Sequence, residues 1–337
     1  MGIHAVSAVS ATLRFSRALR FLTRAMFLSV TAPRMRAPLR NTTNSGTSYD
    51  LYCGKNARKT LIVVHGLTVQ GERDPRLMAF CRALSDSDFR VAAVSLPALK
   101  SCRFERSDLD AIIGLAEKLH PDSDGKVGVI AFCIGAGFAL TAACDPRLVG
   151  RVDPLILFGP YHSLGAAWQT ITSRDFGSLG DVSERSDRLW LLLTLALGRK
   201  KELGLSESEI TELEGLLSVY CYKPDLDKMA SFHEKRLKGR EPILLDPLLP
   251  GSASPDELSP AGKLKSLTCR VMMLHDSQDS LIPSEQTRLL FQELCSRGLQ
   301  GDQRMLITPL LSHLSANWSW HGGDLAELLS ILGEIFR

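Results

Sequence analysis

The stretch KVGVIAFCIGAGFAL, residues 126–140, decides the fold. Its first half is apolar and rich in β-branched residues, which is typical of a strand buried on both faces of a parallel sheet. A turn of small residues follows, and the alanine-rich segment after Gly135 has the composition of a helix. The stretch therefore predicts a strand, a tight turn and a helix, with Cys133 at the turn.

Cys133 occupies the position that a nucleophile takes in such a unit. Residues 131–135, AFCIG, differ from the nucleophile-elbow pattern G-x-S-x-G in the first glycine and in having cysteine for serine. Cysteine is intrinsically a strong nucleophile, so this exchange keeps a catalytic role open. The alternative is a small buried residue, which is a common role of cysteine. The other seven cysteines have no motif around them, so we interpret Cys133 as the reactive one.

Three further segments carry signals in a matching order. Residues 60–67, TLIVVHGL, predict a buried strand that ends in His-Gly. Residues 269–283 predict a strand followed by an acid-bearing turn, and residues 304–313 predict a strand followed by a loop with a histidine. The order nucleophile, acid, histidine is that of α/β-hydrolases. From residue 48 to residue 337 the chain resembles this superfamily, and it is most similar to uncharacterised bacterial members. The cysteine elbow is similar to that of dienelactone hydrolases.

The resemblance implies a doubly wound, mostly parallel sheet with an inserted helical cap. It also implies an oxyanion hole formed by the backbone N–H groups of Leu67 and Ile134. The family spacing after the strand points to Asp279 as the triad acid. Asp276 is the alternative, although a carboxylate directly after a strand often caps the turn.

The expected base is His313, because it follows the end of the last predicted strand by five residues. His321, at the start of the last predicted helix, is the alternative. His162 follows a predicted strand at the sheet edge where ligands bind in open α/β sheets, and we interpret it as a surface histidine. His65 and His275 end strands and are expected to be structural.

The predicted strands and helices alternate, which indicates a parallel sheet. Strands are expected at 48–53, 60–65, 90–95, 126–132, 153–159, 270–275 and 303–308. Helices are expected at 75–85, 107–119, 184–197, 206–217, 223–238 and 284–297. Residues 1–47 are expected to form a basic leader and linker, residues 48–160 and 256–337 the core, and residues 161–255 a helical cap. The apolar run 189–197 is expected to be buried between cap and core, and the alternative is the wall of an acyl pocket.

The leader is basic and amphipathic. Residues 1–49 hold seven arginines and no Asp, Glu or Lys. Phe15, Ala18, Leu19, Leu22 and Met26 recur at helical spacing, with arginines mostly on the other face. An interfacial helix at 14–30 that contacts anionic lipid, an organelle transit peptide and an upstream extension from a misassigned start codon all fit.

Composition excludes several other classes. The chain is 45% hydrophobic and 23% charged, as expected for a globular domain, and its body is mildly acidic, so we expect no nucleic-acid partner. The cysteines and histidines lack metal-ligand spacing, and no dinucleotide-binding glycine pattern follows a strand, so neither metal nor cofactor is expected. Scattered cysteines suit a reducing compartment. We expect a cytoplasmic protein, peripheral to a membrane or, in the transit-peptide case, in an organelle.

Together these features predict a hydrolase that cleaves an ester, thioester or lactone of a small acyl substrate through Cys133, His313 and Asp279. An acyltransferase with the same triad and a non-catalytic binding protein on a hydrolase fold are the alternatives. Because every candidate site residue follows residue 48, the leader and linker are expected to be dispensable for catalysis.

Overall fold

Eight strands form one sheet in the order β1-β2-β4-β3-β5-β6-β7-β8. The computed structural model describes residues 13–24, 38–55, 57, 59–123, 125–173, 182–219, 225–246, 253–296, 303–311 and 322–337. The strands are β1 Leu39–Thr42, β2 Ser48–Cys53, β3 Lys59–Val64, β4 Phe89–Val94, β5 Val127–Phe132, β6 Val152–Phe158, β7 Val271–Asp276 and β8 Gln303–Thr308. The first two strands pair antiparallel with their neighbours, and all other pairs are parallel. All seven predicted strands form, and the predicted fold class is confirmed.

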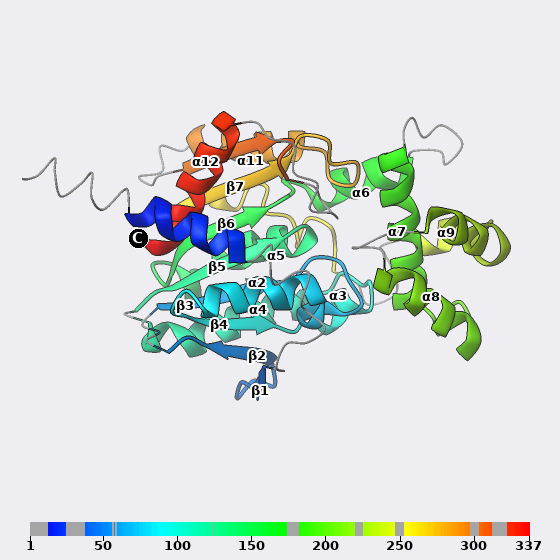
Figure 1. Ribbon diagram of the computed structural model, residues 1–337, viewed down its shortest axis with the longest axis horizontal. Coiled ribbons are helices and arrows are strands. Elements are labelled where there is room, and N and C mark those ends of the chain that lie inside the picture. Colours follow the sequence, from blue (N-terminus) through cyan, green and yellow to red (C-terminus); the bar gives the residue numbers. More distant parts are fainter. Residues whose placement is uncertain are drawn as a thin grey trace, which may run out of the picture.

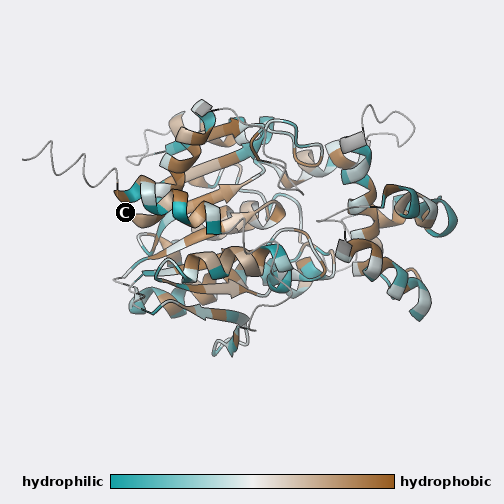
Figure 2. Ribbon diagram, in the orientation of Figure 1, coloured by the Kyte–Doolittle hydropathy of each residue, from teal (hydrophilic) through white to brown (hydrophobic). Residues whose placement is uncertain are grey.

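Helices cover both faces of the sheet (Figure 1). On one face lie α2 Pro75–Ser85, α12 Gly322–Gly333 and a helix of residues 13–24, which share one hydrophobic cluster with the strands. On the other lie α4 Arg106–Leu119, α5 Ile134–Ala143 and α11 Glu285–Ser296. The central strands are largely hydrophobic (Figure 2), as expected for strands that are buried from both sides.

The chain between β6 and β7 is helical wherever the structure describes it as regular. It forms α6 Leu164–Ser173, α7 Val182–Gly198, α8 Glu207–Val219, α9 Leu226–Phe232, a π-helical turn His233–Leu237 and α10 Glu241–Leu244. Helices α7, α8 and α9 lie together at one end of the molecule (Figure 1). These helices occupy the interval predicted as the cap, while the domain boundaries at 160 and 256 stay predictions.

The segment predicted to be a linker contains a strand. β1 pairs with β2 in the register Leu39↔Leu51 and Thr42↔Ser48, through a turn in which Gly46 has φ +87°. Residues 33–48 are rich in Pro, Thr, Asn and Ser, which is typical of a linker, but Asn and Ser equally favour the tight turn of a hairpin. The first strand is therefore part of the sheet.

The helix of residues 13–24 packs on the body. Ala18 and Phe21 are buried, and the Phe21 ring lies 5.3 Å from that of Phe80. Only part of the predicted apolar face contacts the body, because Phe15 and Leu19 remain exposed. Met26 lies outside the described residues. Among the described residues no helix is long and apolar enough to cross a membrane.

Candidate active site

The turn between β5 and α5 has a strained backbone at its apex. Cys133 has φ +53° and ψ −129°, a conformation that a non-glycine residue keeps only where its surroundings hold it. Here the Cys133 N–H donates to the Phe158 carbonyl at 2.7 Å, and the Cys133 carbonyl accepts from the Ala136 N–H at 2.8 Å. A strained turn from strand to helix is the geometry of a nucleophile elbow. The side chain is half-buried, so it is neither sealed in the core nor fully solvated.

Small residues around the turn allow other segments to approach it. A Cβ on Gly135 would lie 2.0 Å from the His65 carbonyl oxygen, and a Cβ on Gly137 would lie 2.2 Å from the ring of Tyr161. Glycine is therefore required at both positions. Ala131 replaces the first glycine of the elbow pattern. It is buried within β5, before the tight part of the turn, and its methyl group is accommodated there.

The loop after β3 lies against the elbow. A Cβ on Gly66 would stand 3.0 Å from the Cβ of Cys133. The loop can approach the turn this closely because Gly66 has no side chain. Leu67 comes next in the chain, and Ile134 is the first residue of α5. Within the described ranges neither of these N–H groups donates a hydrogen bond. Both remain available to a ligand oxygen, as an oxyanion hole would require.

His65 fixes this loop from within the core. Its Nδ1 lies 2.8 Å from the Gly66 carbonyl oxygen, and the Leu96 N–H donates to its Nε2 at 3.3 Å. Complete burial lowers the pKa of His65 to about 4, so the ring is neutral near pH 7. A neutral ring with Nδ1 as donor and Nε2 as acceptor satisfies both contacts. His65 therefore has the structural environment expected for it.

The two candidate acids have different surroundings. The Asp276 Oδ1 accepts from the Gln278 N–H at 2.9 Å and caps the turn. The Asp279 side chain is only 1% exposed, and its Oδ2 lies 3.3 Å from Nε2 of His275. Oδ1 of Asp279 accepts from two backbone N–H groups, those of Leu281 at 2.9 Å and Ile282 at 2.8 Å. Asp279 is thus the buried, oriented carboxylate of the pair.

Both candidate bases, His313 and His321, lie outside the described residues. The strand before His313 is described: β8 pairs with β7 in the register Asp276↔Thr308. Because β5, β7 and β8 run parallel, the turn with Cys133, the loop with Asp279 and the segment that leads to His313 all leave the sheet at one edge. Nε2 of His162 lies 2.8 Å from Oε2 of Glu293 in α11, and the His162 side chain is 23% exposed, so it is half-buried and not on the open surface as expected.

A cleft of about 700 Å³ lies between the loop after β3 and the helices after β6. We call it the cap cleft. Its walls include Thr68 and Val69, which directly follow Leu67, and one face of α7, formed by Trp190, Thr194 and Leu197. The remaining apolar side chains of α7 pack into the core cluster. The run 189–197 is therefore mostly core, as predicted, with one face on the cleft.

No protein-family model matches this chain, and no curated protein matches its sequence. Among solved structures it is similar to the Pyrococcus horikoshii acylaminoacyl peptidase, with 11% identity and a TM-score of 0.47, over 89% of this chain and 41% of that one. The Pyrococcus furiosus esterase Pf2001 gives 14% and 0.46, over 83% of each chain. The Pseudomonas fluorescens meta-cleavage product hydrolase gives 16% and 0.44, over 83% of this chain and 91% of that one.

This chain has the α/β-hydrolase fold. The strand–elbow–helix geometry and the parallel sheet carry that statement, and the structures above assign no activity or substrate to it. The chain spans about two fifths of the peptidase. Among the described residues, no three His, Cys, Asp or Glu side chains are grouped so as to hold a metal ion.

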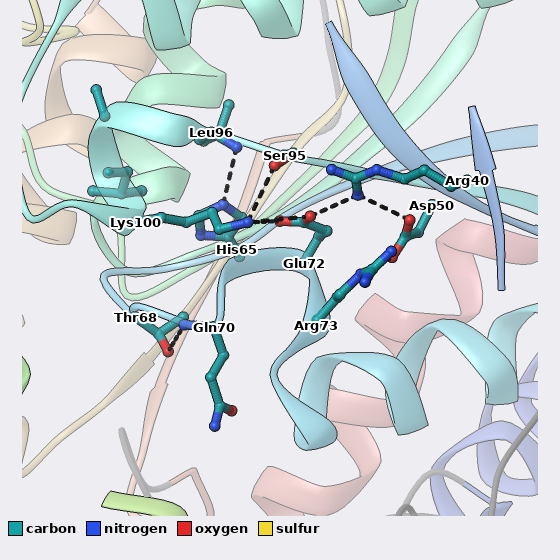
Figure 3. Close-up of polar contacts among 12 residues, drawn as sticks. Arg40, Asp50, His65, Thr68, Gln70, Glu72, Arg73, Ser95, Leu96 and Lys100 are labelled. Carbon is teal, nitrogen blue, oxygen red and sulfur yellow. Dashed lines mark hydrogen bonds and ion pairs between the residues drawn. The ribbon is translucent and has the colours of Figure 1, made fainter. Parts of the chain in front are cut away.

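Sequence reasoning missed two features of this α/β-hydrolase fold. Tyr161 is completely buried, and its Oη donates to the Leu258 carbonyl at 2.9 Å beneath the elbow helix; the two glycines after Cys133 were the available signal. The second is a cluster of charged side chains around two buried carboxylates, beside the loop after β3 (Figure 3). These charges come from segments far apart in the sequence, so no local pattern marks them.

Proposed function

We propose that this protein is a cysteine-dependent hydrolase of carboxylic esters, thioesters or lactones. The observation that carries the proposal is the strained backbone of Cys133 at the start of α5, with the Gly66–Leu67 backbone packed against it. In this proposal the Cys133 thiol is the nucleophile, and the N–H groups of Leu67 and Ile134 bind the oxyanion. The similarity of the elbow to dienelactone hydrolases favours an ester or lactone as the substrate.

In the proposed reaction His313 takes the thiol proton, and the Cys133 sulfur attacks the substrate carbonyl carbon. The carbonyl oxygen becomes an oxyanion, which accepts hydrogen bonds from the N–H groups of Leu67 and Ile134. Asp279 orients His313 and stabilises its charged form. The tetrahedral intermediate collapses to an acyl-enzyme thioester, and the leaving alcohol or thiol receives the proton from His313.

Water then completes the cycle. His313 removes a proton from a water molecule, which attacks the thioester and releases the carboxylic acid and the Cys133 thiol. An alcohol or thiol in place of water would make the same site an acyltransferase. Product analysis with and without an added alcohol separates these two outcomes.

The direct test is a panel of p-nitrophenyl esters and acyl thioesters of short and long chain, assayed together with iodoacetamide labelling of the native protein. We expect turnover of at least one class and faster labelling of Cys133 than of the other cysteines near neutral pH. A chain that neither turns over any member of the panel nor labels preferentially at Cys133 would be a binding protein on this fold.

The cap cleft is proposed to hold the part of the substrate beyond the reacting carbonyl. Trp190→Ala should enlarge the cleft and shift preference towards longer or bulkier acyl groups, with little change for p-nitrophenyl acetate, which leaves the cleft largely empty. The measurement is the ratio of kcat/KM for long and short esters. Leu193→Ala is the matched control: Leu193 is on the same helix but completely buried, so its truncation should lower stability by about 2–5 kcal/mol and leave the ratio unchanged. An unchanged ratio in Trp190→Ala would contradict this role of the cleft.

We also propose a cytoplasmic location with peripheral contact to anionic membranes through the helix of residues 13–24. Three of the large hydrophobic residues that are exposed in the described structure lie on this short helix: Leu13 at 56%, Phe15 at 41% and Leu19 at 45%. Arg17 and Arg20 are exposed beside them, and residues 13–24 contain no acid. Apolar side chains flanked by arginines suit the interface of an anionic bilayer.

This contact predicts salt-dependent binding to vesicles that contain phosphatidylserine. The double variant Phe15→Ser/Leu19→Ser should bind about 10-fold or more weakly, since each exposed apolar side chain contributes on the order of 1 kcal/mol when buried in lipid. Val149→Ser is the control, because Val149 is similarly exposed, at 43%, elsewhere. Vesicle sedimentation is the readout, and equal binding by the double variant would exclude the proposed contact. Point substitutions are preferable to truncation, since Ala18, Phe21 and β1 are parts of the fold.

A further inference from the structure

Five charged side chains meet beside the loop after β3, and we call them the charge cluster (Figure 3). Nη1 of Arg40 lies 2.9 Å from Oδ1 of Asp50 and 2.7 Å from Oε1 of Glu72. Nε of Arg73 lies 3.1 Å from Oδ2 of Asp50, and Nζ of Lys100 lies 3.1 Å from Oε2 of Glu72. Arg40 is therefore the cation that joins the two carboxylates.

The two carboxylates are buried far more deeply than their partners. The Asp50 and Glu72 side chains are 0% and 1% exposed, whereas that of Arg40 is 38% exposed. A carboxylate removed from water is strongly destabilising unless cations and hydrogen-bond donors surround it. The position of Glu72 thus depends on the cations that reach it, and one of them comes from β1, the strand at the edge of the sheet.

Glu72 belongs to the same loop as Leu67, whose N–H is a proposed oxyanion donor. It lies in the 3-10 turn η2, Gly71–Arg73, in the loop that runs from Gly66 and Leu67 to α2. Gly71 has φ +57°, and a Cβ there would lie 2.5 Å from Cδ of Lys100. At the start of the loop, His65 binds the Gly66 carbonyl. The loop is consequently held at both ends, by a neutral imidazole at one and by ion pairs at the other.

We propose that Arg40 is a positioning residue that sets the place of the Leu67 N–H by holding Glu72 against the edge of the sheet. This inference rests on the proposed function, because the Leu67 N–H has a catalytic part only if Cys133 attacks a carbonyl. Oxyanion donors act through exact placement, and a shift of about 1 Å can reduce the rate by roughly 100-fold. Arg40 itself touches no reacting atom.

The test is the variant Arg40→Met, which keeps the length of the side chain and removes its charge. We expect kcat to fall by about 10- to 100-fold with KM within a few-fold of the parent protein. The rate at which iodoacetamide alkylates Cys133 should stay the same, since alkylation forms no oxyanion. A trifluoromethyl ketone, which forms a tetrahedral adduct with a thiol, should lose affinity in parallel with kcat. Arg40→Lys should recover part of the loss, because lysine keeps the charge but lacks the planar guanidinium whose Nη1 donates to both carboxylates.

The pH profile separates this role from a purely structural one. Burial would raise the pKa of Glu72, but hydrogen bonds from Arg40 and Lys100 outweigh it and hold this pKa below its usual value. Glu72 is therefore charged across the working range. Without Arg40 only Lys100 and a backbone hydrogen bond oppose the effect of burial, so we expect the pKa of Glu72 to rise and Glu72 to take up a proton more readily as the pH falls.

The ratio of variant to parent activity should accordingly be lower at pH 5.5 than at pH 8. Among the other groups that face Glu72, His65 stays neutral in that range, because burial lowers its pKa to about 4. Asp74 stays charged, because its pKa is lowered: burial opposes this, but the ion pair and hydrogen bonds of Arg76 outweigh it. Asp50 keeps Arg73 as its cation. Any pH dependence that the two proteins share cancels in the ratio.

Arg90→Met is the matched control. Arg90 is an arginine of the same part of the sheet, in β4, and pairs at 2.9 Å with Asp122, which is 57% exposed; its loss should change neither kcat nor the ratio. A folded Arg40→Met protein with parental kcat, or one that loses kcat and Cys133 alkylation together, would overturn the inference. If Arg40→Met does not fold, the test uses Arg40→Lys, and parental kcat in that variant would overturn the inference. Absence of Cys133-dependent turnover in the parent protein would instead refute the proposed function.

Discussion

Replacing Cys133 by alanine should abolish ester hydrolysis, with a loss of about 10⁴-fold or more, since loss of a nucleophile removes the covalent route altogether. The fold should be unaffected, because alanine keeps the Cβ that lies near Gly66 and the positive φ is held by backbone hydrogen bonds. We expect the free energy of unfolding to change by less than about 1 kcal/mol. The measurements are turnover of the best p-nitrophenyl ester and thermal unfolding of the same preparation.

Two cysteines serve as controls for this experiment. Cys53 and Cys295 are exposed, so Cys53→Ala and Cys295→Ala should keep full activity while removing thiols that compete for iodoacetamide. Turnover that survives in purified Cys133→Ala protein would show that the nucleophile is another residue.

The second large effect is expected at the acid. Asp279→Asn should lower kcat by about 10³- to 10⁴-fold, because an amide cannot stabilise the charged form of His313 or fix its tautomer. The loop should keep its shape, since the amide oxygen can accept the two N–H groups that Oδ1 of Asp279 accepts now. Thermal unfolding and kcat together distinguish a chemical loss from a collapsed loop.

Asp276→Asn is the paired control. Its amide oxygen can keep the hydrogen bond from the Gln278 N–H, so we expect activity within a few-fold of the parent protein. If Asp276→Asn were the damaging change and Asp279→Asn the mild one, the triad acid would lie three residues earlier than proposed.

The sheet was predictable because its strands carry strong local signals. β3, β5 and β6 are short apolar runs buried from both sides, and each ends near the residue that hydropathy indicated. The elbow was predictable for a related reason: a backbone pinched between strand and helix needs small residues at fixed spacing, and Gly135 and Gly137 show that need in the sequence.

Contacts across the sheet could not be predicted in the same way. Arg40 looked like one of many arginines in a basic leader, yet its guanidinium joins Asp50 and Glu72. The leader helix was predicted with one apolar face, but periodicity does not tell which apolar residues meet the body. Ala18 and Phe21 do so because Phe80 and Phe336 complete the surface beneath them, and both of these lie far away in sequence.

The contact of the helix of residues 13–24 with the end of the chain bears on how the protein folds during synthesis. Phe21 lies 6.5 Å from Phe336, and Arg14 lies 3.6 Å from Glu334. Because a ribosome releases the chain from its N-terminal side onwards, this helix is made well before residues 334–336, which complete its docking site. We expect it to wait undocked, with Phe21 open to solvent or to chaperones, until those residues emerge. Docking of this helix would then be a late step of folding.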